Sequence, residues 1–327
     1  MGRSNTRALT EGAILAAITV VIGIIRFYMP LFFILSYFWA VPIIIVGIRH
    51  GFRVSIISSI VASVLLSVFT QPVSGLELFI SFALPGVVMG YMLNRKIKPA
   101  TVILVSGVVL AICSAVGIVL TTMVGGIKLF DVYNKLFSEL STAMTQSMNQ
   151  AGQIYAQLGI SQEEMAKRMP PVDMLISLLK LIVPIMLLWG GMFFAFVNFK
   201  ATKLVLKRIG HEFEDITPFS QWRLSSRMNN IIVVILLVIA AEMFLLKLPA
   251  LASLTYNLFY GVIIIYLILG LSTAIFMLRK YSVPKALRIF ILILVALQFS
   301  YLLAIIGVFD TAFDFRKLKK DSLNDIV

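Results

Sequence analysis

Charged residues inside or at the edges of long apolar runs are the first candidates for chemistry. They are Arg26, Glu77, Lys180, Glu242 and Lys247. A charged side chain at membrane depth is costly and therefore rare, and it points to a functional site. Two cations could hold an anionic group while the glutamates accept hydrogen bonds, which predicts a ligand pocket formed by Arg26, Glu77, Lys180 and Glu242. The alternative is ion pairs between helices, with Arg26 and Lys247 shallow enough to reach the membrane surface.

No pattern for covalent chemistry accompanies these residues. The chain has no Gly-rich phosphate loop with lysine, no His-Glu-x-x-His and no Gly-x-Ser-x-Gly. The single cysteine, Cys113, lies in an apolar run and cannot form an internal disulfide. His50 and His211 are far apart in predicted loops, which does not favour a metal site. We therefore expect no enzymatic activity, no cofactor and no metal.

The composition predicts the elements that must carry these charges. Of the 327 residues, 60% are hydrophobic and 13% charged, and the mean hydropathy is +1.00. Soluble domains have about 45–50% apolar and about 25% charged residues. Apolar runs of about 20 residues recur, the length that crosses a bilayer as a helix, and they do not alternate as in a membrane barrel. The expected fold is an all-α, polytopic transmembrane helix bundle of about nine spans: 9–29, 31–48, 53–70, 76–93, 101–125, 173–198, 229–248, 255–278 and 287–309.

The distribution of charge predicts the orientation. With the N-terminus in the cytoplasm, the cytoplasmic segments carry 17 of the 28 basic and four of the 15 acidic residues, which is the whole net charge of +13. The high charge therefore needs no nucleic-acid partner. Nine spans put the C-terminus outside, although the tail contains the basic stretch FDFRKLKK. Either the tail is extracellular or one span is miscounted.

Two polar segments separate the apolar runs. The basic linker 199–228, predicted to be cytoplasmic, contains PFSQWRLSSR, in which Trp222 can lie at headgroup depth while Arg223 and Arg227 face anionic lipid. A specific contact with a partner is the alternative to this interfacial anchor. The segment 127–172 predicts an extracellular amphipathic helical hairpin, with a capping box at Ser161 and Glu164 opening its second helix. It could act as a lid or as a passive cover.

These segments define the expected domain organisation: a membrane core over 1–198 that includes the 127–172 hairpin, the linker 199–228, a three-helix membrane part over 229–310 and a polar tail over 311–327.

Small residues spaced four apart predict close helix contacts. Ala13 and Ala17 form such a pair in the first span, beside Gly12 and Ala16, and Gly86 and Gly90 form another in the fourth. Such pairs let helix backbones approach, either within the chain or against a partner.

Five stretches together resemble the YybS-like family of bacterial membrane proteins of unassigned function. In chain order they are LTEGAILAAI, VGIRHG, FALPGVVMG, PFSQWRL and FDFRKL. Ser225 and Ser226 depart from the pattern, since a proline is expected after the WRL. The resemblance covers nearly the whole chain and implies a multi-pass protein of the bacterial plasma membrane. Members often lie beside a gene for a membrane-bound cyclic-dinucleotide phosphodiesterase, which suggests a partner of that kind.

The first six spans are also similar to the S component of energy-coupling-factor transporters. S components are six-helix proteins that bind a vitamin or metal on the outside. They dock a coupling subunit through an Ala-x-x-x-Ala face of the first helix, and Ala13 and Ala17 have that spacing. The 127–172 insertion and the three additional spans depart from an S component.

Two functions follow as expectations. The first is binding or transport of a small molecule in the manner of an S component. The second is a non-transporting membrane scaffold or regulator of a signalling partner, such as the phosphodiesterase, which it would bind through cytoplasmic basic segments. The partners expected are membrane lipid, a transporter coupling subunit or phosphodiesterase, and a small-molecule ligand; no nucleic acid is expected.

Overall fold

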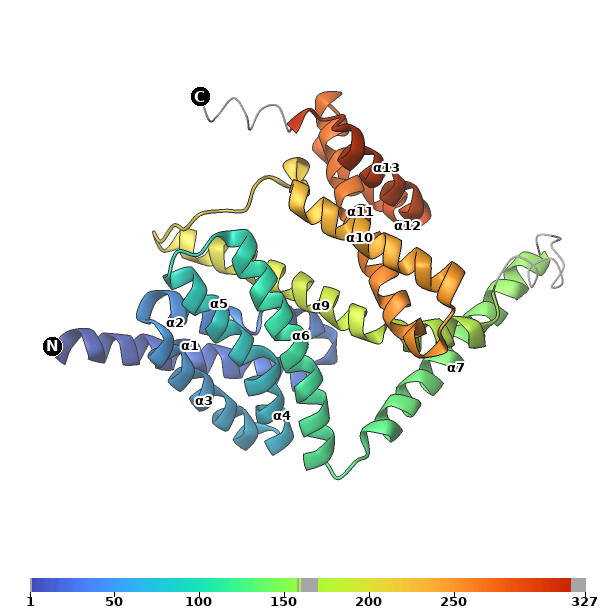
Figure 1. The fold of residues 1–327 in the computed structure, drawn as a ribbon. Coiled ribbons are helices and arrows are strands. Elements are labelled where there is room, and N and C mark those ends of the chain that lie inside the picture. The colour runs from blue at the N-terminus through green and yellow to red at the C-terminus, as the bar shows by residue number, and fades with distance from the viewer. Residues whose placement is uncertain (1, 158, 160–169, 319–327) are drawn as a thin grey trace. The chain divides into compact units, whose positions relative to one another are not determined.

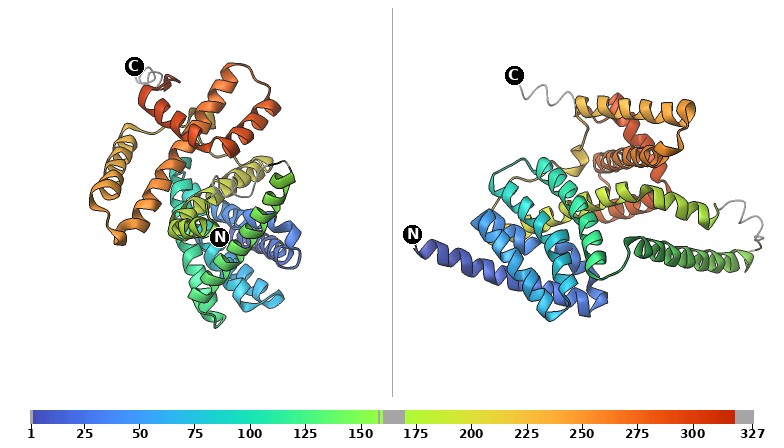
Figure 2. Two further views of the ribbon diagram at one scale, coloured as in Figure 1. Left: turned by 90° about the vertical axis from the view of Figure 1, so that its right-hand side faces the viewer. Right: turned by 60° about the horizontal axis from the view of Figure 1, so that its bottom comes forward.

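The computed structural model describes residues 2–157, 159 and 170–318, and every regular element among them is helical. The chain divides into two compact units, residues 1–215 and 216–327, each described by itself (Figures 1 and 2). The boundary falls inside the predicted linker 199–228. The first part of that linker is helical, because its residues up to Arg208 are the last turns of a long helix.

The elements of the first unit are α1 (Gly2–Tyr28), η1 (Pro30–Phe38), α2 (Val41–His50), α3 (Phe52–Phe69), α4 (Pro72–Glu77), η2 (Leu78–Ala83), α5 (Leu84–Asn94), α6 (Pro99–Val124), α7 (Leu129–Gln157) and α9 (Val172–Arg208). Those of the second unit are η3 (Phe219–Gln221), α10 (Ser226–Ala240), η4 (Ala241–Leu246), η5 (Pro249–Leu251), α11 (Ala252–Lys280), α12 (Lys285–Gln298) and α13 (Ser300–Phe313).

Among the described residues, seven helices are long and apolar enough to cross a membrane, or eight if the bent pair 285–298 and 300–313 is counted as one span. Two of the nine predicted spans differ from a single straight helix. The run 31–48 is divided into the 3-10 helix η1 and the short helix α2, with a proline in the first turn of each. The run 287–309 is divided at Phe299 into α12 and α13, which are bent by 105°. Each of these two helices has 14 residues, about 21 Å at 1.5 Å per residue, and is too short to cross the bilayer alone.

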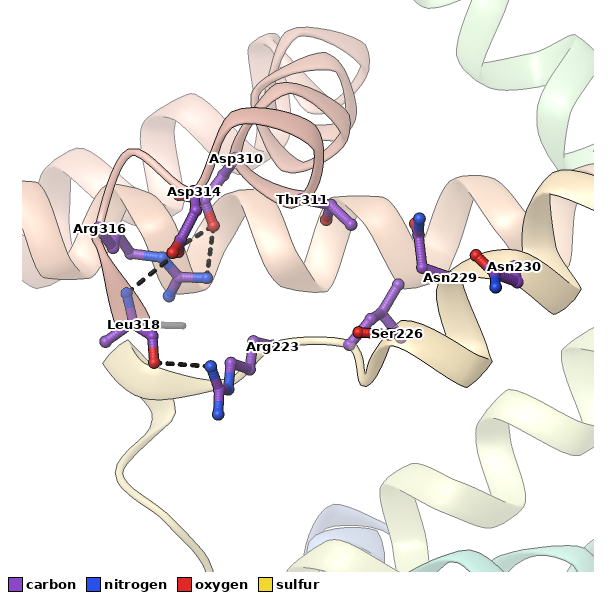
Figure 3. Close-up of a pocket in the computed structure, with 10 residues that line it drawn as sticks. Arg223, Ser226, Asn229, Asn230, Asp310, Thr311, Asp314, Arg316 and Leu318 are labelled. Carbon is purple, nitrogen blue, oxygen red and sulfur yellow. Dashed lines mark hydrogen bonds and ion pairs between the residues drawn. The ribbon is translucent and has the colours of Figure 1, made fainter. Parts of the chain in front are cut away.

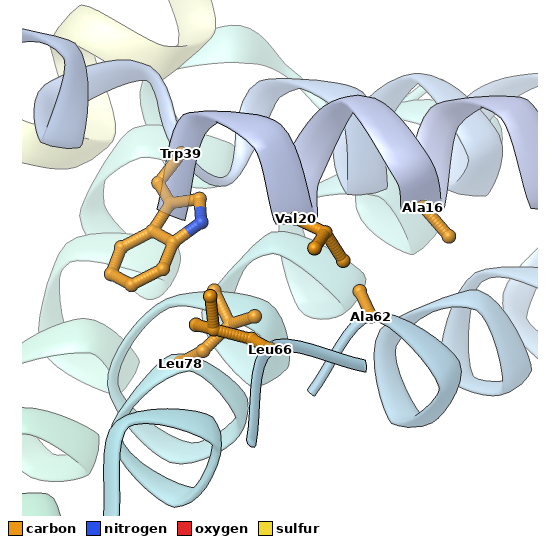
Figure 4. Close-up of a cluster of buried hydrophobic side chains, with 6 residues drawn as sticks. All are labelled: Ala16, Val20, Trp39, Ala62, Leu66 and Leu78. Carbon is orange, nitrogen blue, oxygen red and sulfur yellow. The ribbon is translucent and has the colours of Figure 1, made fainter. Parts of the chain in front are cut away.

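The core of the first unit forms where α1, α3 and η2 meet around Trp39. Ala16, Val20, Ala62, Leu66 and Leu78 surround the tryptophan, and each is at most 4% exposed (Figure 4). The indole Nε1 donates to the carbonyl oxygen of Thr19 at 2.9 Å. A buried indole N–H needs such an acceptor, so the hydrogen bond fixes the ring against α1.

A serine at every fourth position lets α3 pack closely on its neighbours. Ser59, Ser63 and Ser67 each donate to the carbonyl oxygen four residues earlier, and Ser55 donates to Ile43 O of α2 at 3.0 Å. Their hydroxyls are thus satisfied within the helix pair, and their small side chains leave room for adjacent helices.

Glycines allow equally close contacts elsewhere. A Cβ on Gly90 of α5 would lie 2.8 Å from Ile44 O and 3.0 Å from Gly47 Cα of α2, and one on Gly86 would lie 3.3 Å from the Ala40 side chain. In the second unit, a Cβ on Gly270 of α11 would clash with Leu303 O of α13. The helix backbones therefore touch at positions where only glycine fits.

The predicted hairpin 127–172 is described only in its first helix. This helix, α7, has 29 residues and buries Phe137 and Gly152, while most of its other side chains are exposed or half-buried. The second helix, with its proposed capping box at Ser161 and Glu164, lies outside the described residues.

Candidate functional site

Arg26 and Glu77, two of the four predicted pocket residues, form an ion pair. Arg26 Nη2 of α1 lies 3.1 Å from Glu77 Oε1 at the end of α4. The guanidinium carbon also lies 5.2 Å from the centroid of the Trp39 ring, so the same aromatic side chain that organises the core also contacts the cation. The two side chains are 34% and 36% exposed. Both charges are thus compensated within the unit, although both side chains stay partly exposed.

The other two predicted pocket residues have different surroundings. Lys180 of α9 is exposed and its Nζ lies 5.5 Å from the centroid of the Phe137 ring of α7. Among the described residues no ion pair joins it to Glu77. Glu242 belongs to the second unit, where it is 8% exposed in the π-helix η4 and its carbonyl oxygen accepts from Lys247 N at 2.7 Å. Of the predicted four, the described contacts bring together only Arg26 and Glu77.

The small-residue pair of α1 faces outward from the first unit. Gly12 and Ala16 are buried, whereas Ala13 and Ala17 are exposed. The close packing of α1 inside the unit therefore uses the residues beside the predicted pair. Ala13 and Ala17 lie about 100° further around the helix and are exposed. Gly86 and Gly90, by contrast, face α2 within the unit.

A cluster around Glu11 joins two of the stretches that carry the family resemblance, LTEGAILAAI and VGIRHG. Glu11 Oε1 lies 3.1 Å from Arg49 Nη2 and 3.4 Å from Arg7 Nε, and Glu11 Oε2 lies 2.5 Å from His50 Nε2. The side chains of Glu11, Arg49 and His50 are each less than a quarter exposed. The sequence predicts a loop at His50, but His50 is the last residue of the helix α2. Gly51, with φ +82°, then turns the chain into α3. The cluster therefore ties the start of α1 to the end of α2.

A second, more deeply buried cluster surrounds Arg316 in the second unit (Figure 3). The guanidinium donates from Nε and Nη2 to Asp310 Oδ2 at 2.9 and 2.7 Å. It also donates from Nη1 to Ser220 O and Ser272 Oγ and from Nη2 to Trp222 O, at 2.7–2.9 Å. Its side chain is 1% exposed. We call Asp310, Arg316, Ser220, Trp222 and Ser272 the Arg316 clasp. It joins the tail, α11 and the PFSQWRL segment.

The predicted interfacial anchor has a structural role beside any lipid contact. Trp222 is half-buried, its indole Nε1 donates to Thr217 O at 2.9 Å, and its ring lies edge-on to Phe219. Arg223 Nη1 donates to Leu318 O of the tail at 2.6 Å. Arg227 is exposed in the first turn of α10. The rigid turn at 217–222 and the tail therefore hold Trp222 and Arg223, while Arg227 faces outward.

The Arg316 clasp bears on the predicted position of the tail. The sequence leaves two alternatives, an extracellular tail or one miscounted span, and buried hydrogen bonds hold Arg316 against Ser220 and Trp222. The helices α12 and α13, which are bent by 105° at Phe299, are either one broken span or a re-entrant pair. The side of the membrane on which the tail lies stays a prediction.

Both clusters were missed as sites because their members are distant in sequence. Asp310 and Arg316 flank the end of the last apolar run, and Glu11 and the Arg49–His50 pair flank the first two. Opposite charges at adjoining span ends are the signal that could have found them. Among the described residues there is no group of three or more His, Cys, Asp or Glu side chains that could hold a metal ion. Cys113 is free and half-buried.

An all-α chain with several apolar helices of membrane-crossing length is an integral, multi-pass membrane protein. It belongs to the family described as "Predicted membrane protein (DUF2232)", whose family model matches residues 17–311. The chain is 26% identical over 323 residues to "Uncharacterized protein YybS" of Bacillus subtilis (strain 168), covering 97% of this chain and 99% of that protein. No solved structure matches the chain. The resemblance to YybS-like proteins is thus confirmed, and the similarity to S components stays a prediction.

Proposed function

We propose that this protein is a membrane-embedded docking subunit that binds a second integral membrane protein through the outer face of α1. The main support for this proposal is that α1 has one buried face and one exposed face. One face, with Gly12, Ala16 and Val20, is buried in the unit, while Ala13 and Ala17 on the other are exposed. Small residues four apart allow a partner helix to approach the backbone closely, which supplies packing and weak hydrogen bonds that lipid chains cannot match.

The outer face of α1 carries the bulky residues Ile14, Ile18 and Val21, but it also exposes Ala13 and Ala17, and the small pair distinguishes it from the outer face of α3. The exposed positions of α3 carry the bulky residues Ile57, Ile60, Val64 and Val68. Bulky side chains of this kind are suited to contact with lipid tails, but they keep a second helix at a distance. A docking face on α1 is therefore a specific expectation and not a property of every helix in the unit.

A scaffold or regulator fits the charged residues better than a transporter. Arg26, the best-placed cation for an anionic ligand, is already compensated by Glu77 and Trp39. Such a docking role requires no covalent chemistry and no cofactor. The partner would be a membrane-bound signalling enzyme such as a cyclic-dinucleotide phosphodiesterase. A transporter coupling subunit is the other partner that an S-component-like core would bind.

Binding of a small anion is the second candidate function, because the Arg26–Glu77 pair is one-third exposed and joined by a single hydrogen bond. An incoming anionic group could replace Glu77 on Arg26. Transport would then require energy from a partner or an ion gradient.

Co-purification tests the docking role. The full-length chain is extracted in mild detergent together with a tagged candidate partner, and recovery is measured by quantitative mass spectrometry. We expect Ala17→Trp to lower recovery of the partner roughly tenfold, because the indole separates the two backbones. The matched control is Val64→Trp, which changes an equally apolar, 57% exposed position of α3 and should leave recovery unchanged.

Equal recovery with both variants would exclude α1 as the docking face. The same preparations separate the two candidate functions. An enriched small anion that disappears with Arg26→Gln, while partner recovery is unchanged, would favour ligand binding instead. Loss of the partner with Ala17→Trp and no enriched anion would favour the scaffold.

The proposed topology places the N-terminus, the 217–224 segment and the tail in the cytoplasm of a bacterium, with α7 outside. Positive charge on the inner side supports this orientation. The hydrogen bonds of the Arg316 clasp support placing the tail on the same side as the 217–224 segment. A membrane-impermeant maleimide tests it in a Cys113→Ser background. Gln221→Cys and Phe315→Cys should react from the same side of sealed vesicles and Gln146→Cys from the other. Reaction of residues 221 and 315 from opposite sides would contradict the topology.

A further inference from the structure

Two hollows in the second unit follow one another along the same faces of α10 and α13. Each has a volume of about 230 Å³. The first hollow is lined by Asn229 and Asn230 of α10 and by Asp310 and Thr311 of α13. The second is lined by residues one or two turns further along the same helices, including Leu236 of α10 and Ile305 and Val308 of α13. Residues of α11 form the floor of the second hollow. We refer to the two successive hollows together as the groove between α10 and α13.

The first hollow has the chemistry of a headgroup site on its α10 side (Figure 3). It lies at the N-terminus of α10, where Met228 N–H donates to Ser225 Oγ and the N–H groups of the two preceding residues favour an anion. Asn229 and Asn230 add amide donors there, and Arg223 adds a guanidinium that uses one N–H on Leu318 O. A phosphodiester is the anion that this set of donors fits, because it offers several acceptor oxygens to a fork of N–H groups.

The α13 side of the same hollow has the opposite charge. Asp310 is 6% exposed, and its Oδ2 accepts both hydrogen bonds from Arg316. Its Oδ1 is buried and has no hydrogen-bond partner among the described residues. A buried carboxylate oxygen requires a donor, and neither a phosphate nor an apolar chain provides one. A primary ammonium can donate such a hydrogen bond. In an aminoalkyl phosphodiester a short alkyl chain joins the ammonium to the phosphate, so both groups can lie in the same hollow.

The second hollow is apolar along its length. It is lined by Leu236, Phe259, Val262, Ile263, Tyr266, Tyr301, Ala304, Ile305 and Val308. Such a lining suits a hydrocarbon chain. A zwitterionic polar end and an apolar continuation are the two parts of one membrane lipid.

We propose that the groove between α10 and α13 binds a phospholipid whose headgroup carries a primary ammonium. The phosphodiester contacts Arg223 and the N-terminus of α10, the ammonium faces Asp310, and one acyl chain lies over Tyr266 against Ile305. This site belongs to the second unit alone and does not depend on the docking face of α1.

Lipid titration of the purified full-length protein by native mass spectrometry tests the assignment. The probes are phosphatidylethanolamine, phosphatidylcholine and phosphatidylglycerol with identical acyl chains. Phosphatidylethanolamine should be retained several-fold above both others, since choline has no N–H donor and glycerol has no positive charge. Equal retention of the three headgroups would overturn the ammonium assignment.

Paired variants locate the bound lipid. Arg223→Gln should weaken phosphatidylethanolamine binding roughly three- to tenfold, as expected for one lost charge-assisted contact. Arg227→Gln, a change of the neighbouring exposed arginine outside the groove lining, is its control.

Ile305→Trp should fill the apolar part of the groove and reduce lipid retention, whereas Ile293→Trp, at a similarly exposed position of α12, should not. All four positions are on the surface, so the variants should fold. Binding that is equal in each variant and its control would overturn the groove assignment.

Discussion

The ion pairs Arg26–Glu77 and Asp310–Arg316 occupy comparable places in the two units and differ in how they are held. The first pair joins α1 to the end of α4, which are distant in sequence. Asp310 and Arg316 are close in sequence, and Arg316 reaches α11 and the 217–222 turn through its other hydrogen bonds. The first has one hydrogen bond of 3.1 Å and side chains about one-third exposed. The second has side chains 1% and 6% exposed, and the arginine makes five hydrogen bonds to four different groups.

This difference separates a structural pair from one that is available for binding. A buried charge is tolerated only when its partners satisfy it completely, and removing one partner then leaves an uncompensated charge. A partly exposed pair contributes little to stability, because solvent or headgroups can replace either partner. The Arg316 clasp is thus expected to be required for folding of the second unit, whereas the Arg26–Glu77 pair can open at small cost.

The largest effect is expected from Arg316→Ala. The change leaves Asp310 buried without its cation and removes donors from Ser220 O and Trp222 O. It should destabilise the second unit by about 3–5 kcal/mol. Hydrogen–deuterium exchange in detergent measures this as faster exchange across α11, α13 and the 217–222 turn, with the first unit unchanged.

Arg316→Lys sharpens the same prediction. Lysine keeps the charge, but its single ammonium cannot reach four acceptors in the planar arrangement of a guanidinium. Exchange should therefore lie between wild type and Arg316→Ala. If Arg316→Lys exchanges as slowly as wild type, the positive charge alone holds the tail. The hydrogen-bond geometry of the guanidinium would then contribute nothing to the stability of the second unit.

Glu11→Gln should have an intermediate effect. The cluster in which Glu11 takes part is less buried than the Arg316 clasp but better satisfied than the Arg26–Glu77 pair, since one carboxylate has three cationic or potentially cationic neighbours. Loss of its charge should cost about 1–2 kcal/mol, measured as a lower Tm in detergent. Glu139→Gln is the control, because Glu139 is 67% exposed and lies 4.0 Å from Lys135. A Tm unchanged by Glu11→Gln would show that packing alone joins α1 to α2.

Hydropathy predicts most of the fold, because crossing a bilayer leaves a long apolar run whatever the tertiary structure is. It cannot locate the bend at Phe299, since both 285–298 and 300–313 are apolar and no proline or glycine marks the break. The two alternatives that the sequence leaves for the tail follow from that one feature. Only a contact remote in sequence, such as Arg316 with Ser220, shows that the tail lies beside the 217–222 turn.

The candidate site was only partly predictable for a similar reason. A charge in an apolar run can be recognised from sequence, but whether it pairs depends on which helix lies beside it, as Arg26 with Glu77 illustrates. Likewise, the first helix contains two sets of small residues about 100° apart around its axis. Sequence spacing does not decide which set packs inside, and the tertiary structure buries Gly12 and Ala16 and leaves Ala13 and Ala17 exposed.

The smallest effect is expected from Glu77→Gln. The variant removes the only carboxylate that Arg26 contacts in the described structure, yet Arg26 keeps the Trp39 ring and access to its surroundings. The cost should stay below about 1 kcal/mol and shrink further at high salt, because screening weakens an exposed pair. The measurement is the Tm of wild type and variant at low and high ionic strength. A loss as large as that of Arg316→Ala would abolish the distinction between the two pairs, and Arg26 would then have to be regarded as part of the structural core and no longer as a cation available to a ligand.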